Sequence, residues 1–172
     1  MNKQWTETMD AHGVTPLDRA FKSGHMALAD MILRQEREDQ RENLQGSSPL
    51  HRAAGLGLAD AVKSLLSYGS NGMAVDYQGE TPLHKAARQG HKETVELLVS
   101  VSDVNRISAD GMTPLHWACV GGHAEAVRIL LDNNADPWIR NEVLDGLSPV
   151  DIAEAMGYVE VVRIFGAREA MV

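Results

Sequence analysis

The fold is decided by one stretch, Gly79-Glu80-Thr81-Pro82-Leu83-His84-Lys85-Ala86-Ala87-Arg88-Gln89-Gly90-His91. The Thr81 hydroxyl can accept a hydrogen bond from the free N–H groups of a first helical turn, and Pro82 suits the first helical position because its φ is already helical. Gly90 follows nine residues after Thr81, where a helix can end in the left-handed conformation that glycine adopts without strain. The stretch therefore predicts a short helix with a marked start and a marked end.

The same pattern occurs five times along the chain. It opens with Thr15-Pro16-Leu17, Ser48-Pro49-Leu50, Thr81-Pro82-Leu83, Thr113-Pro114-Leu115 and Ser148-Pro149-Val150, at spacings of 33, 33, 32 and 35 residues. The helix-ending glycine recurs as Gly24, Gly57, Gly90, Gly122 and Gly157, and a turn glycine precedes each cap as Gly13, Gly46, Gly79, Gly111 and Gly146. A period near 33 residues predicts a stacked-repeat protein in which each repeat packs only on its neighbours.

A second helix is predicted after each helix-ending glycine. Its apolar positions recur at helical spacing, as Val62, Leu65 and Leu66, then Val95, Leu98 and Val99, then Val127, Leu130 and Leu131, then Val162 and Phe165. The unit is a turn, a short helix, a second turn and a longer helix. One unit alone cannot bury its apolar face, so the units must stack.

This unit resembles the ankyrin repeat, whose pattern is roughly G-x-T-P-L-H-x-A-A-x-x-G-H followed by a V-x-x-L-L helix. The resemblance covers nearly the whole chain. It implies an all-α ankyrin-repeat solenoid of stacked helix-turn-helix units joined by β-turn or hairpin loops. The implied single domain is 1–172, with repeats at about 11–43, 44–76, 77–108, 109–141 and 142–172.

The first and last repeats depart from the pattern in ways that favour a capping role. Asp18 stands where the family has His, and the polar run 34–42 is expected to form a solvated extension of the second helix or a loop. The last repeat has about two extra residues near 142–144 and carries Asp151 at the His position. Terminal repeats must face water, so such changes are expected at both ends.

Composition narrows the classes of partner. The formal net charge of −8 disfavours general binding to nucleic acid or to an anionic membrane, and no apolar run of membrane-spanning length is present. The single Cys119 excludes an internal disulfide and fits a reducing compartment. The stretch Met1–Trp5 has no apolar core of signal-peptide length, so no signal peptide is expected. We expect a monomeric intracellular protein, in the cytoplasm or nucleus, that is not inserted into a membrane.

Six of the seven histidines occupy two repeat positions. They are His51, His84 and His116 near the start of the first helix, and His25, His91 and His123 after the glycine. Because these histidines recur in phase with the helix starts, they are predicted to link neighbouring turns by hydrogen bonds. The set His116, Cys119 and His123 has metal-like spacing but no evident fourth ligand, and Cys119 fits a buried small-residue position. No phosphate loop or nucleophile motif occurs, so neither enzyme activity, nor a metal, nor a cofactor is predicted.

Ankyrin repeats usually bind proteins through their turn tips and first helices, on the concave side of the stack, and this resemblance selects the candidate contact residues. They are Arg19, Lys22, Arg52, Tyr77, Lys85, Arg88, Met112, Trp117, Leu147, Ile152 and Met156. The basic members form a cationic stripe over repeats one to three. The apolar members form a zone over repeats four and five, with Tyr77 at its border. The alternatives are that the stripe is a solvated surface and that Trp117, Ile152 and Met156 pack within the stack.

The hypothesis is a non-catalytic adaptor or scaffold that binds a partner segment along the concave groove. That segment would carry acidic residues at one end and an apolar anchor at the other. Two alternatives stay open: a targeting or regulatory domain of a larger enzyme, channel or transcription regulator, and binding of an anionic ligand by the stripe. Asp103-Val104-Asn105 resembles a site of asparaginyl hydroxylation in ankyrin repeats, but the favoured interpretation is that Asn105 hydrogen-bonds its own turn.

Overall fold

The computed structural model describes residues 14–35, 46–143 and 146–169, and over these ranges it holds ten helices and no strand. The helices are α1 (Pro16–Lys22), α2 (Met26–Gln35), α3 (Pro49–Gly55), α4 (Ala59–Ser67), α5 (Pro82–Gln89), α6 (Lys92–Leu98), α7 (Pro114–Val120), α8 (Ala124–Asp132), α9 (Pro149–Ala155) and α10 (Val159–Glu169). The all-α prediction is confirmed. Gly13 and all but the first two residues of the polar run 34–42 lie outside the described residues.

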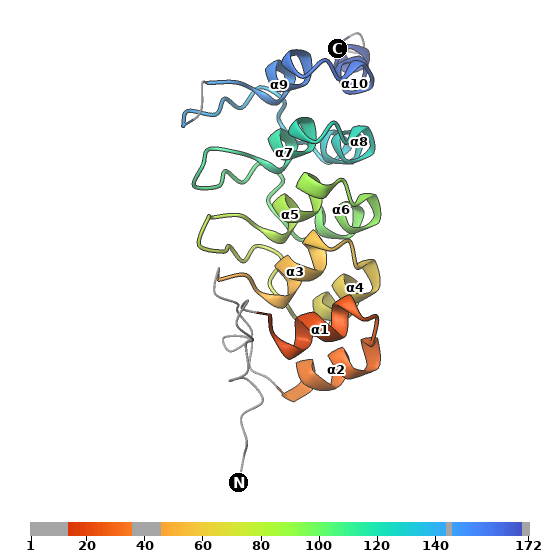
Figure 1. The fold of residues 1–172 in the computed structure, drawn as a ribbon. Coiled ribbons are helices and arrows are strands. Elements are labelled where there is room, and N and C mark those ends of the chain that lie inside the picture. The colour runs from red at the N-terminus through yellow and green to blue at the C-terminus, as the bar shows by residue number, and fades with distance from the viewer. Residues whose placement is uncertain (1–13, 36–45, 144–145, 170–172) are drawn as a thin grey trace.

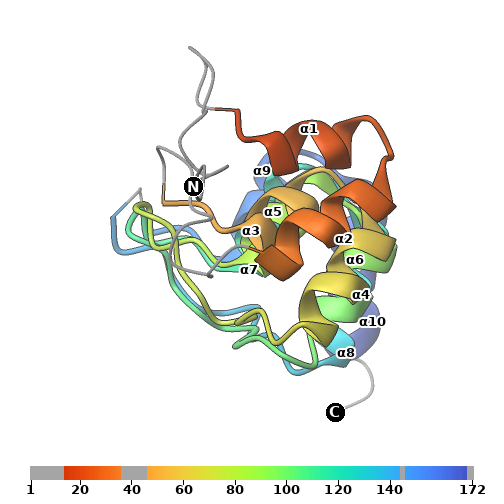
Figure 2. The same cartoon turned by 90° about the horizontal axis from the view of Figure 1, so that it is seen from below.

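The helices stack as five antiparallel pairs in one column. Figure 1 shows the first helices along the middle of the column, with α4, α6, α8 and α10 along one side and α2 beneath α1. The turns of the later repeats project from the other side. Seen along the column in Figure 2, the later pairs lie nearly on top of one another. α3 packs on α5, α5 on α7 and α7 on α9, so each repeat contacts its neighbours in sequence order.

Every first helix begins at the predicted proline, after a cap that closes in both directions. In the third repeat, Nδ1 of His84 accepts from the Thr81 amide at 3.1 Å, while the Thr81 hydroxyl oxygen accepts from the His84 amide. Asp18 and Asp151 accept from Thr15 and Ser148 in the same way in the terminal repeats. The two aspartates therefore keep the cap although they replace the family histidine.

The capping histidines also tie each repeat to the next. The Nε2 atoms of His51, His84 and His116 lie 2.9, 3.2 and 3.2 Å from carbonyl oxygens of the following turn, which belong to Glu80, Met112 and Leu147. The predicted role of these histidines as links between turns is confirmed. Around them, buried Leu50, Leu83 and Leu115 from the first helices pack with valines and leucines of the second helices.

Gly90 and Gly24 give a matched test of the turn geometry. Both have φ +69°, but an added Cβ at Gly90 would lie 2.4 Å from the His123 ring, whereas no described residue lies within 4 Å of one at Gly24. We expect Gly24→Ala to lower the free energy of unfolding by about 1 kcal/mol from backbone strain alone, and Gly90→Ala by roughly 1–3 kcal/mol more from overpacking. Urea denaturation followed by circular dichroism measures both, and equal losses would contradict the packing described here.

Candidate functional site

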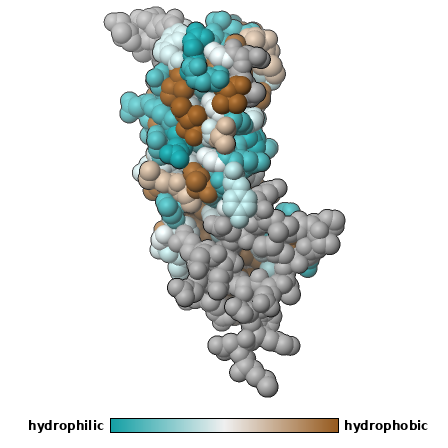
Figure 3. All heavy atoms as spheres, turned by 90° about the vertical axis from the view of Figure 1, so that its left-hand side faces the viewer, coloured by the Kyte–Doolittle hydropathy of each residue, from teal (hydrophilic) through white to brown (hydrophobic). Residues whose placement is uncertain are grey.

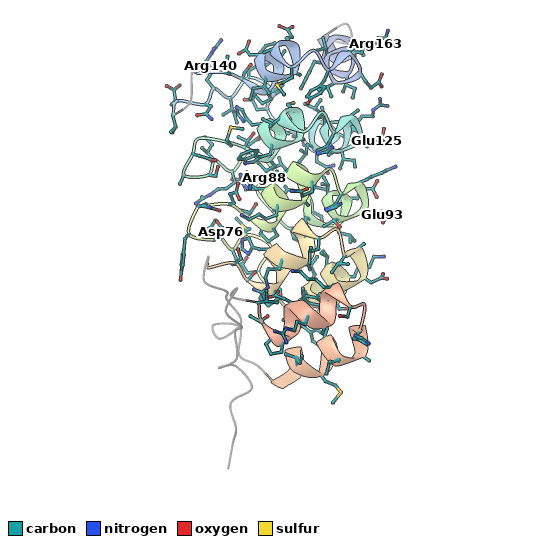
Figure 4. All side chains as sticks on the ribbon, in the orientation of Figure 1. Asp76, Arg88, Glu93, Glu125, Arg140 and Arg163 are labelled. Carbon is teal, nitrogen blue, oxygen red and sulfur yellow. The ribbon has the colours of Figure 1, made fainter. Side chains whose placement is uncertain are left out.

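The candidate site is the turn face, defined here as the turns between repeats together with the adjoining surface of the first helices. Figure 4 shows Asp76 and Arg88 on this side of the column, and Glu93, Glu125 and Arg163 on the side of the second helices. The turns are joined into a ladder, because the Ala109 amide donates to the Gln78 carbonyl at 2.9 Å and Asn141 Nδ2 donates to the Asp110 carbonyl at 3.1 Å. The face is therefore built on a connected backbone.

A buried carboxylate organises the turn face of the third repeat. Glu80 lies at the end of the turn, is almost fully buried, and pairs through one oxygen with Lys85 and through the other with Arg88. Lys85 Nζ also lies 2.7 Å from Asp76 Oδ2. Asp76 and Glu80, at the turn between repeats two and three, therefore neutralise Lys85 and Arg88 of repeat three.

Asp76 is held as an anion by its surroundings. Its Oδ1 accepts from the amides of Gln78 and Glu80, each at 3.0 Å. Burial opposes ionisation, but the contact with Lys85 and these amide hydrogen bonds outweigh it and hold the pKa of Asp76 below its usual value. The negative charge that balances Lys85 is thus built into the turn.

The predicted cationic stripe needs correction at three positions. Arg52 pairs with buried Asp18 of the preceding repeat, and Lys85 and Arg88 pair with Glu80. Because each of these cations faces a buried carboxylate, they do not present the uncompensated positive charge on which an acidic partner would depend. Glu80 stands five residues before Lys85 and eight before Arg88, and Asp18 stands 34 residues before Arg52, so comparing the basic positions of successive repeats missed these acids.

Arg19 and Lys22 are the remaining members of the stripe. Both side chains are exposed on α1. Their contact with a partner stays a prediction.

Trp117 is joined to the charged cluster through Arg88. The guanidinium carbon of Arg88 lies 3.6 Å from the centroid of the indole ring, a cation–π arrangement between α5 and α7. Since Glu80 fixes the same guanidinium, the chain of contacts runs from Glu80 through Arg88 to Trp117. The indole is partly buried, in line with the alternative that it packs partly on a neighbouring repeat.

The predicted apolar zone is smaller than expected. Met112 is only 5% exposed and Ile152 9%, and both belong to the core, so they are removed from the candidate surface. Met112 sits beneath the turn, where its sulfur lies 2.9 Å from Asn141 Nδ2. Leu147 is 37% exposed and Met156 53%, and Tyr77 is 76% exposed, so these three can reach a partner.

Sequence reasoning missed other exposed apolar side chains. Ile107 and Val143 lie in the turns before α7 and α9, and Figure 3 shows apolar surface gathered over these turns among hydrophilic residues. Trp138 is 58% exposed and stands 33 residues after Asn105, at the same place in the next turn. The sequence did carry a signal for Trp138, because a tryptophan stands there at the position where the preceding repeat has the polar residue Asn105.

His116 and Cys119 have structural roles that leave them unsuited to catalysis or metal binding. Both ring nitrogens of His116 lie within hydrogen-bond distance of neighbours, Thr113 on one side and the Leu147 carbonyl on the other. Cys119 is buried, and burial raises the pKa of its thiol to about 12, which leaves it unreactive. Among the described residues no three His, Cys, Asp or Glu side chains are grouped to hold a metal ion.

Asn105 links two turns. Its Nδ2 donates to the Asn134 carbonyl at 3.1 Å, and its Oδ1 accepts from the Asp136 amide at 2.8 Å. Its own amide bonds to Asp103 Oδ1 at 3.0 Å. The prediction that Asn105 hydrogen-bonds its turn is confirmed, and the bonds extend to the next turn as well.

A family model described as ankyrin repeats (3 copies) matches residues 18–108, 61–141 and 102–170, which together span most of the chain. The chain belongs to the ankyrin-repeat family. A search among curated proteins gave no significant match. Ankyrin repeats are generally protein–protein interaction modules, and the turn face is the part of this ankyrin chain that carries the candidate contacts. No helix within the described ranges is long and apolar enough to cross a bilayer.

Removing the charge of Glu80 tests the buried cluster. We expect Glu80→Gln to lower the free energy of unfolding by roughly 3–5 kcal/mol, because Lys85 and Arg88 would lose their shared buried anion. Glu93→Gln, at an exposed position of α6, is the control, and its expected change in the free energy of unfolding is within about 0.5 kcal/mol. Urea titration gives both values, and a mild effect of Glu80→Gln would mean that the cluster is dispensable for stability.

The capping histidines predict a loss of stability in acid. Burial lowers the pKa of both His51 and His84 to about 4 from the usual 6.5. The unfolded chain therefore takes up protons near pH 6.5 while the folded chain resists until about pH 4. Stability is full above pH 6.5 and falls toward pH 4, by about 3 kcal/mol for each ring.

The measurement is the free energy of unfolding of wild type and His84→Gln between pH 7 and pH 4. Glutamine does not titrate, so the deficit of the variant relative to wild type should shrink as the pH falls. A constant deficit would show that His84 is not held neutral by the fold.

Proposed function

We propose that this ankyrin chain is a non-catalytic adaptor or scaffold that binds a segment of a partner protein along its turn face. The observation that carries the proposal is the fixed Arg88–Trp117 stack, and exposed Tyr77, Leu147 and Met156 add apolar surface for contact. Tryptophan and arginine are the residue types most often found at the energetic centre of protein interfaces. Since Glu80 holds Arg88 in place, this surface is already ordered before a partner arrives.

The buried ion pairs sharpen the chemistry of the proposed partner. Over repeats two and three the basic side chains are already neutralised, so affinity there would come from apolar and hydrogen-bonding contacts. Exposed Lys22 on α1 is the place where an acidic end of the partner segment would lie. The proposed partner is therefore an apolar segment over repeats three to five whose acidic residues, if any, reach repeat one.

Binding of an anionic ligand through the stripe is less favoured, because Asp18, Asp76 and Glu80 occupy the cations that it would use. A role as the targeting or regulatory domain of a longer protein would use the same surface and remains compatible with the proposal. The proposed setting is a monomer inside the cell, in the cytoplasm or nucleus, which the single buried cysteine favours.

Leu147→Asp is the first test, because this exposed side chain can be changed without disturbing the core. The chain, with a photocrosslinking residue in place of Tyr77, is used to capture its partner from extract of the native cell. We expect one prominent partner whose capture is lost with Leu147→Asp. Capture should be kept with Val159→Asp, which places the same change at an exposed position of α10. A partner captured equally by both variants would contradict binding at the turn face.

Once the partner segment is identified, Trp117→Ala measures the anchor. We expect its affinity to fall by about 2 kcal/mol or more, roughly 30-fold, with the helical content unchanged by circular dichroism. Affinity should change little when the salt concentration is raised, because the cations of repeats two and three are already paired. A steep loss of affinity with salt, together with indifference to Trp117→Ala, would favour an anionic ligand instead.

A further inference from the structure

Three of the four seams between neighbouring repeats are closed by an aromatic ring. The ring comes from the tenth position after a cap, lies against the helix-ending glycine of the preceding repeat, and reaches a carbonyl oxygen of that repeat. His91 lies against Gly57, and its Nε2 lies 3.1 Å from the Gly55 carbonyl oxygen. His123 lies against Gly90, and its Nε2 lies 3.0 Å from the Arg88 carbonyl oxygen. Tyr158 lies against Gly122, and its hydroxyl lies 3.4 Å from the Val120 carbonyl oxygen. A ring with an N–H or O–H donor is thus the normal closure of a seam in this chain.

The seam between repeats one and two is built differently. Leu58 stands at the ring position, and no atom of the described residues lies within 4 Å of the place where a Cβ on Gly24 would be. The carbonyl that matches the three acceptors belongs to Lys22, and no side chain among the described residues donates to it. Leucine is too short to span this seam and has no donor to offer.

A hollow lies at this seam, on the side of the second helices. Its described lining includes Gly24 of repeat one and Leu58 of repeat two, with Phe21 and Leu97 as further apolar lining. Phe21 is almost fully buried, so the apolar surface that remains open comes largely from Leu58 and Leu97, both partly buried. The hollow thus combines an open glycine with apolar walls.

The rim of the hollow is acidic. Asp60, Glu93 and Glu96 line it together with one cation, Lys63, whose Nζ lies 3.9 Å from Asp60. Neither Glu93 nor Glu96 has an ion-pair partner among the described residues. Figure 4 shows Glu93 on the opposite side of the column from Asp76 and Arg88, so this rim is separate from the turn face.

We propose that the first seam is a second binding site, which receives an aromatic side chain of a partner protein that is flanked by basic residues. The ring lies over Gly24 beside Leu58, and its N–H or O–H donates to the Lys22 carbonyl, as His91, His123 and Tyr158 do at their own seams. The flanking Lys or Arg side chains meet Glu93 and Glu96. This site does not depend on the turn face, so either proposal can fail alone.

The probe is acetyl-Arg-Tyr-Arg-amide, titrated into the isotope-labelled full chain and followed by NMR. We expect shifts of the amide signals of Gly24, Leu58 and Glu93. The controls are acetyl-Arg-Ala-Arg-amide, which lacks the ring, and acetyl-Glu-Tyr-Glu-amide, which reverses the charge, and each should bind at least tenfold more weakly. Equal binding of the Ala peptide, or shifts confined to the turn face, would overturn the proposal.

Leu58→His supplies the ring from within the chain and should abolish peptide binding, whereas Leu58→Met, an apolar change without a ring, should retain it. Glu93→Lys combined with Glu96→Lys changes only exposed positions and should weaken binding at least tenfold. Unchanged affinity in Leu58→His or in the double variant would overturn the proposal. Peptide binding that appears only after Trp5→Ala and His12→Ala would do the same, because the chain's own N-terminal segment would then be the occupant.

Discussion

The stack depends on the side chain at the third position of each first helix. In the three central repeats this is a buried histidine that accepts from the cap amide through Nδ1 and donates to the next turn through Nε2. One ring thereby caps the helix N-terminus and fixes the position of the following repeat in the stack. Because both bonds are buried, a charged or rotated ring would leave polar groups unpaired, and this requirement holds the ring neutral and in one orientation.

The scaffold could be predicted from the sequence because its requirements are local and repeated. Thr81 and Pro82 mark a helix start and Gly90 marks its end through backbone geometry that any reader of the chain can recognise. Five copies in phase turn these local signals into a fold. The histidines could be assigned for the same reason, since a residue that recurs with the helix starts serves the helix starts.

The candidate surface was harder to predict because exposure is set by neighbours in the next repeat and in the turn. Met112 seemed to belong to a turn tip by its place in the sequence, yet it is buried beneath Asn141, which enters from the following turn. The charge of Arg52 is cancelled by Asp18, 34 residues earlier. A single column read along the repeats carries none of this, because the compensating residue stands in another column.

The two ends of a repeat protein therefore need different kinds of reasoning from its middle. In the middle, a charged side chain at a variable position of the pattern is compensated by other residues, as Lys85 is by Asp76 and Glu80. At the first seam, Leu58 replaces a ring, and no described residue restores the missing contact at Gly24. Where a repeat changes and its neighbours compensate, the change serves stability. At the first seam the change is not compensated, and apolar surface lies exposed beside carboxylates that have no ion-pair partner among the described residues. Such a surface is available to another molecule.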